Sequence, residues 1–192
     1  MTWSAPRPLA SGVARGNPPF RPACLLMNGL TAGAIAIAIN SIILFAADWI
    51  PLTTAHGGLL KLIKPFAAGP LQASGIAAGW QALGLPAPHS AVFKIGFHVA
   101  VGLAMVVVYA FIVEPVLRGS AWLKGLLYAA FAWIMNAFIV LPWIGEGIAG
   151  SRNLSLAGMG YFAFAHIVFF VLVAVLYRKF MNDASHRQEI IL

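Results

Sequence analysis

Charged side chains are scarce in this chain of 192 residues. Only 9% of the residues are Asp, Glu, Lys or Arg, whereas 61% are hydrophobic and the mean hydropathy is +0.88. A typical soluble domain carries about 25% charged residues. So few charges cannot cover the surface of a soluble fold, and the composition therefore predicts an integral membrane protein.

Cysteine is nearly absent, and so are the motifs of common enzymes. Cys24 is the only cysteine, which excludes an intrachain disulfide and a cysteine-based metal cluster. The sequence contains no P-loop, no Rossmann glycine set, no nucleophile elbow and no HExxH motif. We therefore expect a protein without catalytic residues and, apart from a haem alternative considered below, without a cofactor.

Basic residues outnumber acidic residues by 12 to 5. They are dispersed around the ends of apolar runs, which is typical of topology determinants and of contacts with anionic lipid headgroups. A nucleic-acid site would need them gathered in one basic patch. We therefore expect the lipid bilayer as a partner, and no nucleic acid.

Four apolar segments are long enough to cross a membrane, over about 28–50, 91–116, 121–145 and 155–179. A helix needs about 20 residues to cross a hydrocarbon core of roughly 30 Å. The segments are continuously apolar rather than alternating, which favours helices over a β-barrel. The short links at 117–120 and 146–154 require helical hairpins, so we predict an all-α, antiparallel up-down bundle of four transmembrane helices.

The remaining segments are an N-terminal arm, a long connection and a tail. Residues 1–27 are rich in Pro and Arg, and Met27 offers an alternative start. Within the first connection, residues 57–85 form short amphipathic stretches broken by prolines, which favours interfacial or re-entrant helices. We expect the membrane domain over 28–180 and a cytoplasmic tail over 181–192.

The division of Lys and Arg between the two sides of the predicted bundle sets its orientation. Eight lie on the side of the termini, namely Arg7, Arg15, Arg21, Arg118, Lys124, Arg178, Lys179 and Arg187. Four lie on the other side, namely Lys61, Lys64, Lys94 and Arg152. We therefore expect a multi-pass membrane protein with both termini cytoplasmic, which for a bacterial chain means the inner (cytoplasmic) membrane.

Small residues four positions apart predict where helices approach each other closely in lipid. Three spans carry such a pair. The pairs are Gly29 with Gly33, Gly96 with Ala100, and Gly125 with Ala129. We expect these three faces to pack against neighbouring helices.

Each span carries one strongly polar side chain well inside its apolar run. A rise of about 1.5 Å per residue from the outer span ends places Asn40 about 15 Å deep, His98 about 10 Å, Asn136 about 12 Å and His166 about 16 Å. We call these four residues the polar layer. Polar groups inside a membrane cost free energy and usually face the bundle interior.

Three interpretations of the polar layer stay open. The four side chains could hydrogen-bond across the helices and fix their register. His98 and His166 could hold a b-type haem through both axial positions. The layer could also line a transport or proton path, although no inverted repeat and no midplane acid supports this.

Two further groups of polar residues lie near the span ends. Glu114 and Glu146 are close enough to the headgroups to be solvated, and we expect that role for both carboxylates. His56, His89 and Glu146 could together form an outer-face site, but no ligand spacing supports a metal there.

The four spans resemble an uncharacterised family of small bacterial membrane proteins with four transmembrane helices. The resembling pieces are "NGLTAGAIAIAINSIILF", "FKIGFHVAVGLAMVVVYA", "WLKGLLYAAFAWIMNAFIVLPWIGEGIAG" and "FAHIVFFVLVAVLY". The residues that carry the resemblance are His98, Pro142, Gly145, Gly147 and His166. It covers about residues 28–179 and implies the four-helix topology, but no activity.

Two classes of function follow from the sequence. The first is a non-catalytic accessory subunit of a larger membrane protein complex, for example a respiratory or photosynthetic electron-transfer complex. Small size and the lack of catalytic motifs favour it. The alternative is a transporter, channel or b-haem protein that uses the polar layer.

Overall fold

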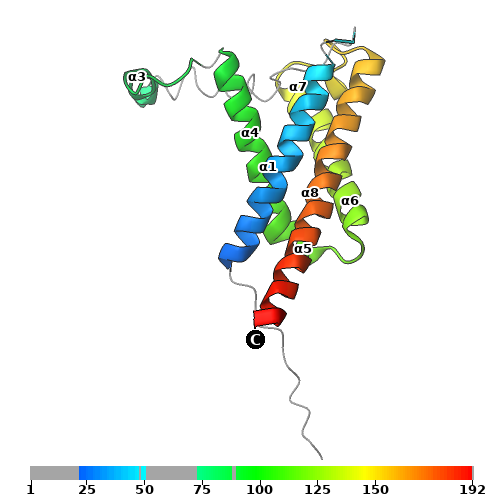
Figure 1. Ribbon diagram of the computed structural model, residues 1–192. Helices are drawn as coiled ribbons and strands as arrows, with labels where there is room; N and C mark the ends of the chain where they lie inside the picture. The colour runs from blue at the N-terminus through cyan, green and yellow to red at the C-terminus, as the bar shows by residue number, and fades with distance from the viewer. Residues whose placement is uncertain (1–21, 48, 51–72, 88–89, 192) are drawn as a thin grey trace, which may run out of the picture.

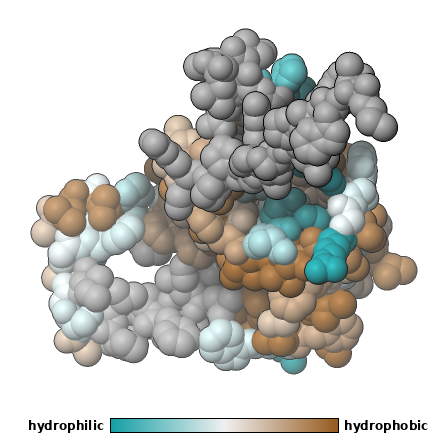
Figure 2. Space-filling model, turned by 90° about the horizontal axis from the view of Figure 1, so that it is seen from below, coloured by the Kyte–Doolittle hydropathy of each residue, from teal (hydrophilic) through white to brown (hydrophobic). Residues whose placement is uncertain are grey.

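The computed structural model describes residues 22–47, 49–50, 73–87 and 90–191. In these ranges every regular element is a helix, and four helical segments are long and apolar enough to cross a membrane. They identify the chain as a multi-pass membrane protein, which confirms the predicted all-α fold with four spans. Figure 2, a view from below, shows hydrophobic residues over much of the visible face and hydrophilic residues among them.

The spanning helices begin at residues that suit a helix start. The first, α1 (Pro22–Ala46), begins at a proline, whose fixed φ and missing N–H suit the first helical position. The other three are α4 (Ala91–Val108), α6 (Ala121–Met135) and α8 (Leu156–Ile191). Each follows a serine whose hydroxyl accepts a hydrogen bond from a backbone N–H of the first turn. These pairs are Ser90 with Phe93, Ser120 with Leu123 and Ser155 with Gly158, at 3.2, 3.3 and 3.0 Å.

Two spans widen into a π-helix just before a proline. The π-helix η2 (Tyr109–Val113) leads into α5 (Glu114–Val116), and η3 (Asn136–Val140) leads into α7 (Leu141–Trp143). Pro115 and Pro142 have no N–H to donate, and a proline ring clashes with the carbonyl four residues earlier in an α-helix. The wider π turn relieves this clash, so both spans continue through the proline.

The central helix of the bundle is α8, which packs against α1 on one side and α6 on the other (Figure 1). Tyr161 near the start of α8 donates a hydrogen bond to the carbonyl of Ile43 near the end of α1. Asn28 near the start of α1 donates to the sulfur of Met181 near the end of α8. The two helices therefore run in opposite directions. We call the end where α1 begins and α8 ends the terminal end, and the opposite end the loop end.

Glycines allow two close helix contacts, as the small-residue pairs predict. A Cβ added to Gly33 of α1 would lie 2.6 Å from Val106 of α4, and one added to Gly125 of α6 would lie 2.7 Å from the Cα of Val171 in α8. At Gly96, in contrast, no atom of another described helix lies within 4 Å of the Cβ position. The expectation that Gly96 and Ala100 pack against another span of this chain is therefore wrong.

Toward the loop end, α4 leaves the bundle. It packs mainly against α1 and diverges from the other spans (Figure 1), and none of residues 91–100 is buried. The short helix α3 (Ile76–Ala82) lies outside the bundle, at the level of the loop end. Its Trp80 ring meets the Phe93 ring edge-on at 5.8 Å. We call α3 together with residues 91–100 the α3–α4 arm.

The helices depart from the predicted boundaries at both ends of the chain. Residues 22–27 belong to α1 rather than to the N-terminal arm, and α1 ends at Ala46, before the expected end near residue 50. At the other end, α8 continues to Ile191, so the predicted tail is helical, because residues 180–191 contain no proline or glycine to stop it. Residues 51–72 of the first connection and residues 1–21 lie outside the described ranges.

Candidate functional site

His166 lies in α8 among aromatic rings of α6 and α8. Its ring centroid is 4.5 Å from that of Phe162 and 5.7 Å from that of Trp133. Its Nδ1 lies 2.9 Å from the carbonyl oxygen of Phe162. Since a carbonyl can only accept, the neutral ring carries its proton on Nδ1, and Nε2 presents a lone pair.

Two other polar-layer atoms are buried and have no hydrogen bond to any residue that the structure describes. They are Nε2 of His98, on α4, and Oδ1 of Asn40, on α1, which is only 9% exposed. Burying a polar atom without a partner costs about 1–3 kcal/mol. Such an atom in a folded protein is commonly explained by an ordered water, an ion or a ligand.

Helix register places these side chains at one level. Gly102 of α4 lies against Ile37 of α1, since a Cβ on the glycine would come within 2.7 Å of the isoleucine. Because the contact of Gly33 with Val106 shows that α1 and α4 run in opposite directions, Asn40 lies at the level of His98. A Cβ on Gly102 would also lie 3.8 Å from the Phe169 ring of α8, and α4 and α8 both run opposite to α1, so His98 and His166 lie near one level. The structure therefore places three members of the polar layer at one level.

Asn136 lies at the edge of this group. It follows Trp133, which contacts His166, by three residues, and it begins the π-helix η3. Its side chain is half-buried, and no hydrogen bond to it occurs among the described residues. Asn136 is therefore about one helical turn away from His166.

Of the expected outer-face site, only Glu146 falls in the described part of the chain, because His56 and His89 lie outside it. Glu146 is 3% exposed, so the expectation of a solvated carboxylate is wrong. The turn between α7 and α8 folds around it: Asn153 donates its side-chain amide to the carboxylate, and the backbone N–H of Arg152 donates to the Glu146 carbonyl at 2.9 Å. Over the described ranges, no three His, Cys, Asp or Glu side chains form a metal-binding group.

A buried polar cluster at the terminal end was not predicted from the sequence. Lys124 Nζ lies 2.7 Å from Glu114 Oε1 and also donates to the Glu114 carbonyl at 2.9 Å. Tyr109 donates its hydroxyl to Glu114 Oε2 at 2.6 Å. Glu114 is thus ion-paired rather than freely solvated, and Lys124 is a buried partner rather than a free topology charge. The sequence feature that could have predicted this cluster is the four-residue link at 117–120. It brings Glu114 and Lys124 to the same end of the bundle.

Comparisons of the chain with models of protein families, with curated proteins and with solved structures found no match. The resemblance to a four-span bacterial family stays a prediction. The function has to be argued from the geometry of the molecule itself.

Proposed function

We propose that the protein is a non-catalytic accessory subunit of a larger membrane complex in a bacterial cytoplasmic membrane. The α3–α4 arm carries this proposal. A membrane-spanning helix gains stability by packing a face against its neighbours. In α1, α6 and α8 buried residues recur along the length of the span, whereas residues 91–100 of α4 include none.

The exposed half of α4 has the composition of a helix contact surface. Gly96 and Ala100 are both exposed, and small residues let the backbone of another helix approach closely. Val92 and Ile95 beside them are 66% and 51% exposed. A helix of a partner subunit packed on this face would supply the neighbours that the described part of the chain does not.

Site-specific photo-crosslinking in native membranes tests the proposal. A benzoylphenylalanine at Ile95 is expected to give a defined adduct with another membrane protein after irradiation. The matched control is the same label at Phe131 of α6, which is also exposed but lies on a span that buries a face against α8. The control is expected to give no protein adduct.

Three outcomes would overturn the proposal. The Ile95 label could react only with lipid, it could react within its own chain, or it could give the same protein adducts as the Phe131 label. In each case the α3–α4 arm would not be a specific surface for a partner subunit.

The unpartnered atoms of the polar layer favour a second candidate, a ligand-handling bundle. Asn40 Oδ1 and His98 Nε2 have no hydrogen bond within the described ranges, and Nε2 of His166 presents a lone pair. Two imidazoles on separate helices are the ligand set of a b-type haem, and neutral polar groups can also line a transport path. This support is narrower, because it rests on three side chains and on no described cavity that joins them.

The absorption spectrum of the purified protein separates the two candidates. A reducible Soret band that is lost in both His98→Ala and His166→Ala would establish the haem alternative. If the protein is colourless and both variants still assemble with partner subunits, the haem alternative is rejected and the accessory role stands.

A further inference from the structure

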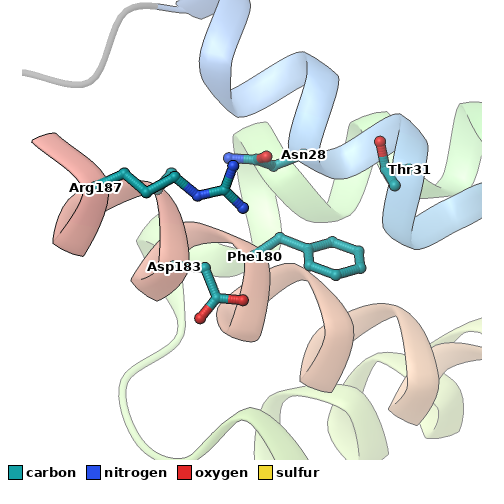
Figure 3. Close-up of a pocket in the computed structure, with 6 residues that line it drawn as sticks. Asn28, Thr31, Phe180, Asp183 and Arg187 are labelled. Atoms are coloured by element: carbon teal, nitrogen blue, oxygen red, sulfur yellow. The ribbon is translucent and has the colours of Figure 1, made fainter.

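A groove of about 480 Å³ runs between the start of α1 and the end of α8 at the terminal end. It is lined by Asn28 and Thr31 of α1 and by Phe180, Asp183, Ala184 and Arg187 of α8. Figure 3 shows Arg187 reaching across from α8 toward Asn28, with Phe180 between the two helices. The groove lies away from the polar layer and from the α3–α4 arm.

Two hydrogen-bond donors converge in the groove. The guanidinium of Arg187 and the amide nitrogen of Asn28 are turned toward each other in Figure 3. Among the described residues, the Asn28 amide donates only to the sulfurs of Cys24 and Met181, at 3.5 and 3.4 Å, and sulfur is a weak acceptor. A strong acceptor between the two donors, such as a phosphate oxygen, would satisfy both.

The other charged group of the groove is an acid. Asp183 lies one helical turn before Arg187 on α8, and no ion pair joins them within the described residues. A groove that holds one unpaired cation and one unpaired anion suits a zwitterion better than a purely anionic group.

The groove also lies at the depth of lipid headgroups. With 36 residues, α8 is about 54 Å long, whereas about 20 residues cross the hydrocarbon core. Counted from Leu156, residues 180–187 lie beyond that core. The Asn28 contact with Met181 places the Asn28 amide near the level of Met181, and the Arg187 guanidinium is turned back toward that amide.

A cation and an anion in one groove at headgroup depth match a zwitterionic phospholipid, and we infer that the groove binds the headgroup of phosphatidylethanolamine. The phosphate accepts from Arg187 and Asn28, and the ammonium donates to Asp183. Phe180 contacts the part of an acyl chain next to the headgroup. The inference does not depend on the proposed accessory role, because it concerns a different surface.

Lipid titration of the delipidated protein in detergent tests this inference. Phosphatidylethanolamine, phosphatidylcholine and phosphatidylglycerol with identical acyl chains are compared by native mass spectrometry and by the thermal shift. We expect phosphatidylethanolamine to bind about tenfold more tightly than phosphatidylcholine, whose trimethylammonium cannot donate to Asp183. Asp183→Asn should remove the preference for phosphatidylethanolamine. Arg187→Gln should weaken the binding of all three lipids.

Lys179→Gln is the matched control, because it removes an exposed positive charge from the same helix outside the groove. It should leave the preference unchanged. Equal effects of Lys179→Gln and Arg187→Gln, or tightest binding of phosphatidylglycerol in the unmodified chain, would reduce the groove to a general basic surface and overturn the inference. The same stabilisation by inorganic phosphate alone would reassign the groove to a free anion, which also overturns it.

Discussion

Lys124 is a buried lysine at the terminal end, and its contacts explain why the chain tolerates it. The Glu114 carboxylate and carbonyl both accept from its ammonium, and Tyr109 donates to the second carboxylate oxygen. Removing ions from water costs several kcal/mol each, which a close pair with further hydrogen bonds can offset. The three side chains therefore act as one unit, in which each partner depends on the others.

Removing one charge of this unit should lower the free energy of unfolding more than removing both charges. We expect Lys124→Met to lower the free energy of unfolding by about 3–5 kcal/mol, because it leaves the Glu114 charge without its partner. The double variant with Glu114→Gln should be more stable than Lys124→Met alone. Denaturant titration in detergent measures both, with Lys179→Met as the exposed-lysine control. A double variant less stable than either single one would contradict the ion-pair argument.

At the residue scale, substitutions of Asn40 test whether a water, ion or ligand is bound at the polar layer. If nothing binds, Asn40→Leu removes a buried unsatisfied atom and should raise the free energy of unfolding by about 1 kcal/mol. Asn40→Asp, which buries a charge, should be destabilising and serves as the opposing control. A clear loss of stability in Asn40→Leu would mean that the Asn40 oxygen has a partner in the folded protein.

At the scale of the elements, close contact between backbones holds α6 against α8. The Cβ position of Gly125 lies 2.7 Å from a Cα and 3.0 Å from the Phe170 carbonyl oxygen, and backbone atoms cannot rotate away as a side chain can. Tyr128 continues this contact one turn later, with its ring 4.4 Å from that of Phe170. The close packing of α6 on α8 therefore requires that residue 125 has no Cβ.

Gly125→Ala should lower the free energy of unfolding by about 1–3 kcal/mol, because the added Cβ forces the two helices apart. Gly96→Ala is the matched control, since nothing lies within 4 Å of its Cβ position. It should leave stability unchanged or raise it by up to about 1 kcal/mol, because alanine favours a helix more than glycine does. Thermal unfolding in detergent compares the two variants, and equal effects would contradict the close packing of α6 on α8.

At the scale of the whole molecule, positive charge gathers at the terminal end. Arg118, Arg178, Lys179 and Arg187 lie there, and Arg178 also donates to the Gly119 carbonyl at 3.1 Å, which ties the end of α8 to the turn before α6. Only Lys94 and Arg152 lie at the loop end among the described residues. The bias favours a cytoplasmic terminal end.

Cysteine labelling checks this orientation. In a Cys24→Ala background, Asn182→Cys at the terminal end should react with a membrane-impermeant maleimide in inverted vesicles but not in spheroplasts. Ser151→Cys at the loop end should show the reverse pattern. Both positions are exposed, so access is set by the side of the membrane. Labelling of Asn182→Cys in intact spheroplasts would reverse the orientation.

The sequence alone determined that the protein spans a membrane four times. Continuous apolar length is a local property that can be read without the fold. The sequence also predicted similar depths for Asn40, His98 and His166, because depth in a helix follows from residue count.

Only the tertiary structure decided which helix faces meet. It buried Glu146 in a turn and paired Glu114 with Lys124. Among the described residues, it also left Gly96 without a close neighbour and two polar-layer atoms without hydrogen-bond partners. In an apolar sequence almost every face can meet either lipid or another helix, so hydrophobicity does not distinguish a contact face from a lipid face. Rotation of each helix about its axis, which the three-dimensional packing sets, makes that distinction.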